Sequence, residues 1–169
     1  MPGSDKNWTD QDVPFGTTEM VLAFTNQSRY ADEITADNWF EILQRPDVRF
    51  GTANPVLDAA GYRSIMVLAL ADRHYGRDYI LDRVFSGQFS PPVMVQKEAT
   101  ITRVILPDVM KPSGRKVTIR DGSIFLLSLL KTGGIDYALE YRCVAEGEQL
   151  PYIRLPDQIN LGNSGYAYF

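Results

Sequence analysis

Two kinds of group near predicted helix starts in this chain could bind an anion. Gly61-Tyr62-Arg63-Ser64 is predicted to open a helix. The first amides of a helix have no acceptor within it and carry the positive end of its dipole. Arg63 would add a charge-assisted donor to an oxyanion. The alternative is an ordinary helix start with a solvated arginine, because every helix has such an end.

Three polar residues precede predicted helices. Asp58 lies three residues before Gly61, and Asp121 and Ser123 flank the start of a second predicted helix. Aspartate and serine are favoured both in loops and as helix caps, so capping is the default interpretation of all three. The same side chains would also face any ligand that binds at these helix starts.

Two tyrosines and one histidine complete the candidates. Tyr137 and Tyr141 lie four apart in a predicted strand, so both point to one face, and one hydroxyl could reach the site. Two core tyrosines would give the same pattern. His74 is the only histidine and is interpreted as a surface residue at a helix end. The motifs GxSxG, GxxxxGK[ST] and GxGxxG do not occur, so no enzyme is expected.

Composition restricts the class of protein. A length of 169 residues with 44% hydrophobic and 22% charged residues is typical of one globular domain. The net charge of −4 and the pI near 5.0 provide no basic field for nucleic-acid phosphates. Cys143 is the only cysteine, which excludes an intramolecular disulfide and a zinc cluster built on cysteines.

No segment of the sequence is predicted to enter a membrane. The apolar run at 124–130 is far shorter than the roughly 20 residues that a spanning helix needs. Residues 1–12 are polar and lack the apolar centre of a signal peptide. We expect a flexible N-terminal arm at 1–14, followed by one folded unit at 15–169.

Strand and helix patterns alternate along the chain. Apolar or alternating runs predict strands at 20–24, 48–50, 100–106, 116–120, 135–141 and 152–155. Helical spacing predicts a deeply buried helix at 123–130 and three others, at 38–43 with Thr35 or Asp37 as its cap, from Gly61 to Gly76, and at 78–85. This order predicts an α/β fold with a mostly parallel open sheet and helices on both faces. Ligands of such sheets collect at the carboxyl ends of the strands.

Three stretches resemble a known family. They are EMVLAFTNQSRYADEITADNWFEILQRPDVRFG at 19–51, AGYRS at 60–64 and LLSLLKTGGIDYALEYRCVAEGEQLPYIRLPDQINL at 126–161. Together they resemble the molybdate/tungstate-binding proteins of ABC importers, especially the archaeal-type branch. The resemblance implies a type II periplasmic-binding fold, in which two lobes close on the ligand like a clamshell. This chain would correspond to the second lobe nearly alone.

The resemblance also implies a site. In the archaeal-type members a loop aspartate and a helix-start glutamate ligate the metal of the oxyanion, and a tyrosine lies nearby. Asp58 matches the aspartate, Ser123 occupies the glutamate position, and Tyr141 matches the tyrosine. Serine is a hydrogen-bond donor but a poor substitute for a carboxylate ligand, so a hydrogen-bonded tetrahedral anion is expected. With the amides of Gly61 and Tyr62, these residues form the expected half-site, and no cofactor is expected.

We therefore expect a non-enzymatic, extracytoplasmic solute-binding lobe that delivers molybdate or tungstate to an importer permease. A lone lobe is expected to bind the anion weakly, because it cannot exclude water from the far side. Two alternatives remain: a regulatory or interaction module of the same fold that binds another small anion, and an enzyme that uses Asp58 and Tyr141 as acid and base. An exposed lobe face could also pair two copies of the chain.

Overall fold

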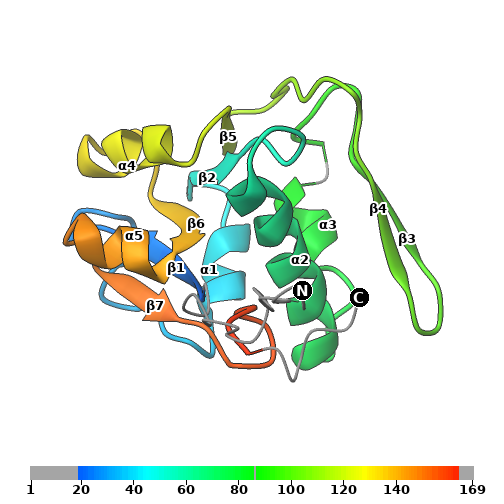
Figure 1. Ribbon diagram of the computed structural model, residues 1–169, viewed down its shortest axis with the longest axis horizontal. Helices are drawn as coiled ribbons and strands as arrows, with labels where there is room; N and C mark the ends of the chain where they lie inside the picture. The colour runs from blue at the N-terminus through cyan, green and yellow to red at the C-terminus, as the bar shows by residue number, and fades with distance from the viewer. Residues whose placement is uncertain (1–18, 86, 164–169) are drawn as a thin grey trace, which may run out of the picture.

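The computed structural model describes residues 19–85 and 87–163, so the arm predicted at 1–14 lies outside the described residues. A central sheet is covered by helices on both faces (Figure 1). In chain order the elements are β1 Met20–Phe24, α1 Trp39–Gln44, β2 Phe50–Ala53, α2 Ala59–His74, α3 Ile80–Phe85, β3 Met94–Lys97, β4 Thr102–Ile105, β5 Val117–Arg120, α4 Ile124–Lys131, β6 Tyr137–Tyr141, α5 Arg142–Gly147 and β7 Tyr152–Arg154.

The sheet has the strand order β5-β2-β6-β1-β7. Strand β2 pairs in parallel with both β5 and β6, whereas β1 runs antiparallel to β6 and β7. Four of the five strands therefore point the same way. The predicted α/β fold with a mostly parallel sheet is confirmed, and the carboxyl ends of β5, β2 and β6 lie at one edge.

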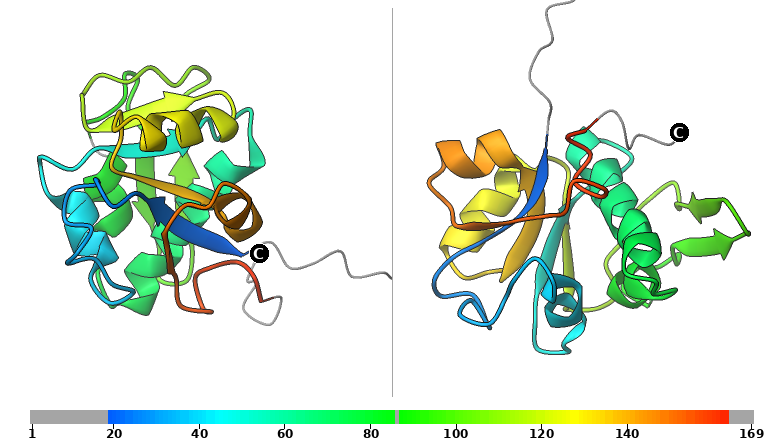
Figure 2. Two further views of the ribbon diagram at one scale, coloured as in Figure 1. Left: turned by 90° about the vertical axis from the view of Figure 1, so that its left-hand side faces the viewer. Right: turned by 90° about the horizontal axis from the view of Figure 1, so that it is seen from below.

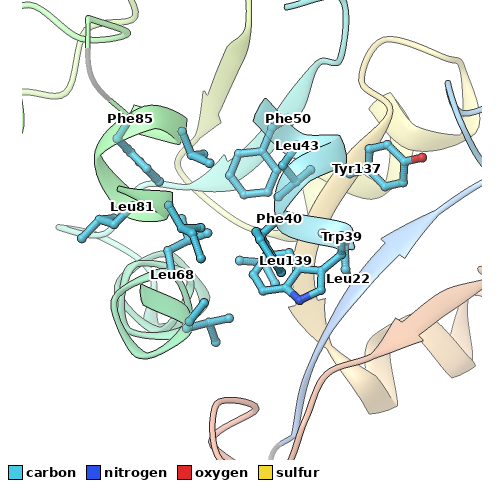
Figure 3. Close-up of a cluster of buried hydrophobic side chains, with 14 of the residues drawn as sticks. Leu22, Trp39, Phe40, Leu43, Phe50, Leu68, Leu81, Phe85, Tyr137 and Leu139 are labelled. Carbon is cyan, nitrogen blue, oxygen red and sulfur yellow. The ribbon is translucent and has the colours of Figure 1, made fainter. Parts of the chain in front are cut away.

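Two apolar clusters hold the helices to the sheet. The larger one lies between the sheet and the helices α1, α2 and α3, and its labelled side chains include Trp39, Phe50 and Leu68 (Figure 3). The smaller one packs α4 and α5 on the opposite face through residues such as Leu126 and Ala145. Figure 2 shows these three layers from the side. None of the described helices is long and apolar enough to span a membrane.

Several element boundaries differ from the predicted ones. Helix α1 has Asn38 as its N-cap in place of Thr35 or Asp37, and its side-chain oxygen accepts from the Thr35 amide at 2.7 Å. Strand β2 occupies 50–53 and not 48–50, because its ladder to β5 pairs Phe50 with Val117 and continues to Ala53. Helix α5, which the sequence did not predict, begins directly after β6.

A two-stranded hairpin formed by β3 and β4 projects from the α2–α3 side of the molecule (Figure 1). The predicted strand at 100–106 corresponds to β4, but its partner β3 was not predicted. Lys97 of β3 fastens the hairpin to the helical layer, since its ammonium group lies 2.8 Å from Asp72 Oδ2. Asp72 also binds the start of α3, because its Oδ1 accepts a hydrogen bond at 2.6 Å from the amide of Ile80, the first residue of that helix.

Asp136 fastens the amino end of β6 to two other segments. Its carboxylate accepts hydrogen bonds from the backbone amides of Arg49 at 2.8 Å and Arg29 at 3.2 Å, and from both guanidinium groups. Burial alone would raise the pKa of Asp136, but the bonds from Arg49 and Arg29 outweigh it and hold this pKa below its usual range. Asp136 is therefore a structural carboxylate at the sheet edge opposite the candidate site.

Candidate functional site

The candidate site lies where β2, β5 and β6 end. The Asn54 amide donates to the Arg120 carbonyl oxygen at 2.7 Å, so the segments that leave β2 and β5 start side by side. These segments lead into α2 and α4, which both begin at this edge of the sheet (Figure 1). The location agrees with the rule that ligands bind beyond the carboxyl ends of parallel strands.

Asp58 joins the two helix starts. It is the N-cap of α2, where its Oδ1 accepts from the Ala60 amide at 2.7 Å. Its Oδ2 accepts from the Ser123 amide at 3.1 Å. Ser123 is the N-cap residue of α4 but makes no side-chain cap bond of its own. One carboxylate thus accepts from an amide at the start of each helix, and the structure brings together Asp58 and Ser123, which are 65 residues apart in sequence.

The predicted role of the Gly61 and Tyr62 amides needs correction. Helix α2 begins at Ala59, two residues earlier than predicted, because Asp58 caps it. The amides of Gly61 and Tyr62 therefore both donate to the Asp58 carbonyl oxygen, at 3.0 and 3.4 Å, and are not free donors. Whether these two residues contact a ligand in another way stays a prediction.

Other amides at the helix starts are free instead. Within residues 19–85 and 87–163, the amide hydrogens of Ala59 and Ile124, the first residues of α2 and α4, have no hydrogen-bond acceptor. Each belongs to the positive end of its helix. Because Asp58 links the two helix starts, both amides belong to one small region of the surface.

Gly61 is needed for packing. A Cβ atom at this position would lie 2.5 Å from the Ala53 carbonyl oxygen and 2.7 Å from the Pro55 nitrogen. These are backbone atoms that cannot move aside as a flexible side chain can. Gly61 therefore lets the first turn of α2 lie directly against the end of β2, which places Asp58 at the sheet edge.

The two candidate tyrosines have different surroundings. Tyr137 is fully buried, and its hydroxyl donates to the Arg29 carbonyl oxygen, so it is a core residue. Tyr141 is only partly buried, and the Arg63 guanidinium carbon lies 5.7 Å from its ring centroid. Burial raises the pKa of Tyr141, the positive charge of Arg63 lowers it, and the negative charge of Asp58 raises it. Tyr141 therefore lies within the electrostatic reach of Asp58 and Arg63, as the site requires.

Glu140 is a site neighbour that sequence reasoning missed. Its side chain is fully buried, and its Oε1 accepts from the Tyr141 amide at 2.8 Å. Burial raises the pKa of Glu140, the Tyr141 amide and the Ser123 side chain lower it, and Asp58 raises it further. No hydrogen bond to Glu140 Oε2 meets normal geometry among the described residues. A glutamate in the otherwise apolar strand YALEY was the signal that could have identified it.

An apolar rim surrounds the two helix starts. It consists of large side chains with exposed fractions from 45% to 64%: Val56, Leu57, Tyr62, Ile124 and Phe125. The prediction that the helix at 123–130 is deeply buried is therefore wrong for its first turn, because that turn extends past the sheet edge. Several large exposed apolar side chains near one site are typical of a surface that another protein or domain covers.

The described residues offer no preformed cation site. They contain no group of three or more histidine, cysteine, aspartate or glutamate side chains that could hold a metal ion. His74 is exposed at the last turn of α2, as predicted. The amides of Ala59 and Ile124 can donate hydrogen bonds to an anion.

Replacement of Asp58 by alanine is expected to lower the free energy of unfolding by about 2 kcal/mol, because it removes a helix cap and a bond to a second helix. Denaturant unfolding monitored by circular dichroism would measure this. Asp121→Ala is the matched control: Asp121 is exposed next to the same site, and among the described residues it accepts from Asn54 Nδ2 alone, at 3.4 Å. We expect a loss below about 0.5 kcal/mol there. Equal losses in the two variants would contradict the linking role of Asp58.

Comparison with known proteins gives a consistent result. The family described as bacterial extracellular solute-binding protein matches residues 4–168. An uncharacterized solute-binding protein of Methanoculleus marisnigri is 40% identical over 167 residues, which is 99% of this chain and 45% of that protein.

Two further relatives have names that specify a ligand. Proteins named molybdate/tungstate-binding protein WtpA from Thermococcus kodakarensis and Pyrococcus abyssi are each 40% identical to this chain. They align with 92% and 96% of this chain, and with 42% and 46% of their own length, respectively. The chain therefore spans a little less than half the length of these relatives.

Proposed function

Because the chain belongs to the bacterial extracellular solute-binding protein family, we propose that it is a solute-binding lobe for tetrahedral oxyanions of the molybdate and tungstate type. One observation carries the proposal: Asp58 joins the starts of α2 and α4 at the carboxyl edge of the sheet. The amides of Ala59 and Ile124, which have no acceptor within the described part of the chain, and the Ser123 hydroxyl lie there, and such groups suit an anion. The names of two relatives supply the choice of anion.

The donors of the proposed site come from both helices and from β6. They are the amides of Ala59 and Ile124, the hydroxyls of Ser123 and Tyr141, and the positive charge of Arg63. Hydrogen bonds to an ionised acceptor are stronger than neutral ones, and several of them around one tetrahedral anion would select for its shape and charge. We propose that the anion is held by these donors, with Ser123 in place of a metal-ligating carboxylate.

The charge of Asp58 is compatible with an anion nearby. An isolated carboxylate close to a dianion would be repelled by it. Here Asp58 accepts from two helix-start amides, at 2.7 and 3.1 Å, so the positive ends of two helix dipoles offset its charge. Asp58 would then position both helices around the anion. Direct coordination of the anion's metal by Asp58 stays a prediction from the resemblance.

The biological role that we propose is capture of a small oxyanion outside the cytoplasm and its delivery to an ABC importer permease. Members of the family bind solutes. The relatives are more than twice as long as the aligned region, so a second lobe would close over the apolar rim and exclude water from the anion. The proposed site needs neither a nucleic acid nor a cofactor.

Titration of the nitrogen-15-labelled chain with sodium tungstate and sodium molybdate tests this function. We expect chemical-shift changes concentrated at the amides of 58–60, 122–125 and 140–142, with those around Asp136 unchanged. Sodium chloride at matched ionic strength is the control, and Ser123→Ala is expected to weaken the response. If tungstate causes no localised changes beyond those caused by chloride, the proposed function is wrong.

A further inference from the structure

Glu140 lies next to two of the proposed anion donors, Ser123 and Tyr141. It is fully buried on β6. Its Oε1 accepts a hydrogen bond at 2.8 Å from the amide of Tyr141, the next residue in the sequence. The Ser123 side chain at the start of α4 is near enough to act on its charge. Its second oxygen, Oε2, is buried, and among residues 19–85 and 87–163 no hydrogen bond to it meets normal geometry, although the Ser123 side chain interacts with the carboxylate. A buried carboxylate oxygen that is poorly hydrogen-bonded is costly, and a proton on Oε2 would turn it into a donor.

The state of Glu140 decides where the single proton of the Ser123 hydroxyl points. A charged carboxylate only accepts, so it draws that proton toward itself and leaves the lone pairs of Ser123 facing outward. A neutral carboxyl can instead donate from Oε2 to Ser123 Oγ, which frees the serine proton to donate to a ligand. An oxyanion requires the second arrangement. It also disfavours a second negative charge beneath it.

We infer that Glu140 is a proton-holding positioning residue, and that binding of an oxyanion at Ser123 is accompanied by uptake of one proton from solvent on the Glu140 carboxylate. The inference rests on the proposed function of the same site. Burial and the charge of Asp58 both act in the required direction, since each raises the pKa of Glu140. Affinity then falls as pH rises through this pKa, because binding must bring a proton with it.

The other charged groups around Glu140 belong to four elements. Asp58 and Arg63 lie on the α2 side, and Tyr141 belongs to β6 itself. Ser123 lies at the start of α4, whereas Lys131, the basic residue of that helix, lies in its last turn. Glu19 precedes β1 at the same sheet edge and is paired with the side chains of Arg142 and Arg154. Only Glu140 among these carboxylates is fully buried, which singles it out as the group that takes the proton.

The test compares tungstate affinity of the full chain and of Glu140→Gln between about pH 6.5 and about pH 8.5 by nitrogen-15 NMR titration. We expect the affinity of the unmodified chain to fall as pH rises, at most about tenfold per pH unit, as one linked proton requires. Glutamine mimics the neutral carboxyl, so the variant should bind with a nearly constant affinity over the same range. Glu41→Gln, an exposed glutamate in α1, is the matched control and should keep the pH dependence.

Two measurements without ligand give independent results. Carbon-13 NMR of the Glu140 carboxyl should show a pKa above the usual range of glutamate. Because a raised pKa means that stability is lost as pH rises through it, Glu140→Gln should resist denaturant better than the unmodified chain, and the difference should grow with pH. The inference is overturned by any of three results. These are a normal or lowered pKa of Glu140, a Glu140→Gln variant that does not fold, and a tungstate affinity that depends on pH equally in both proteins.

The outcomes separate the two ideas. If tungstate causes localised shifts in both proteins but with the same pH dependence, the inference about Glu140 is wrong and the proposed function stands. If tungstate causes no localised shifts in either protein at any pH, the proposed function is wrong, and the inference is overturned with it.

Discussion

Replacement of Gly61 by alanine is expected to lower the free energy of unfolding by about 2–3 kcal/mol and to weaken tungstate binding as well. The added methyl group would lie 2.5 Å from the Ala53 carbonyl oxygen and 2.7 Å from the Pro55 nitrogen. The first turn of α2 must then move away from the end of β2, and Asp58 moves with it. Denaturant unfolding and the tungstate titration of the same variant measure the two effects.

The control for Gly61 is the same substitution at Gly147. This glycine is the last residue of α5, and a Cβ atom there would have no heavy atom within 4 Å. Alanine is the better helix former, so Gly147→Ala should leave stability unchanged or raise it by up to about 1 kcal/mol. A loss at Gly147 as large as that at Gly61 would show that the effect comes from glycine replacement in general and not from contact with β2.

Replacement of Asp136 by asparagine is expected to cost about 2–4 kcal/mol at neutral pH. Asparagine has one acceptor oxygen, so it cannot serve the amides of Arg29 and Arg49 and their guanidinium groups together. The pKa of Asp136 is lowered in the folded state, so its contribution is complete above the unfolded pKa. It is lost as pH falls through the lowered value. Urea unfolding at several pH values would therefore show the two proteins becoming similar in stability under acidic conditions.

Asp157→Asn is the control for this prediction. Asp157 is 59% exposed in its side chain and is 3.7 Å from Arg154. An exposed pair of this kind contributes little, and asparagine keeps an oxygen that can accept from Asn160 Nδ2, as Asp157 does at 3.2 Å, so we expect a change below about 0.5 kcal/mol. If the stability gap between the Asp136 variant and the unmodified chain were constant down to acidic pH, the lowered pKa of Asp136 would be contradicted.

The sequence predicted the layered fold because its apolar runs are strong. Strand β1 has the predicted bounds, and the predicted strand at 135–141 contains all of β6, since both are apolar runs buried on two faces. The hairpin strand β3 was missed because its side chains are mostly exposed and give no apolar pattern. The apolar pattern also predicted that the first turn of α4 is buried, but its Ile124 and Phe125 are exposed.

The site was predicted in part. Sequence placed Asp58 and Ser123 each before a helix, and the structure adds that one carboxylate serves both helices. The exact start of α2 could not be predicted, because it depends on a cap whose effect reaches beyond the local sequence. Glu140 was missed because a single charged residue in a strand does not show which groups surround it, and only the fold brings Ser123 and Asp58 near it.

The position of β1 determines when this chain can complete its fold during synthesis. Its residues pair with Tyr137–Tyr141 and with Tyr152–Arg154, so the partners lie between 113 residues (Phe24 to Tyr137) and 133 residues (Val21 to Arg154) later in the chain. Pairing of strands so far apart in the sequence is slow, because closing the long loop between them costs conformational entropy before the new contacts form. A nascent chain that still lacks the segment at 137–154 would therefore leave an apolar strand with both edges open, which favours aggregation until β6 and β7 have been synthesised.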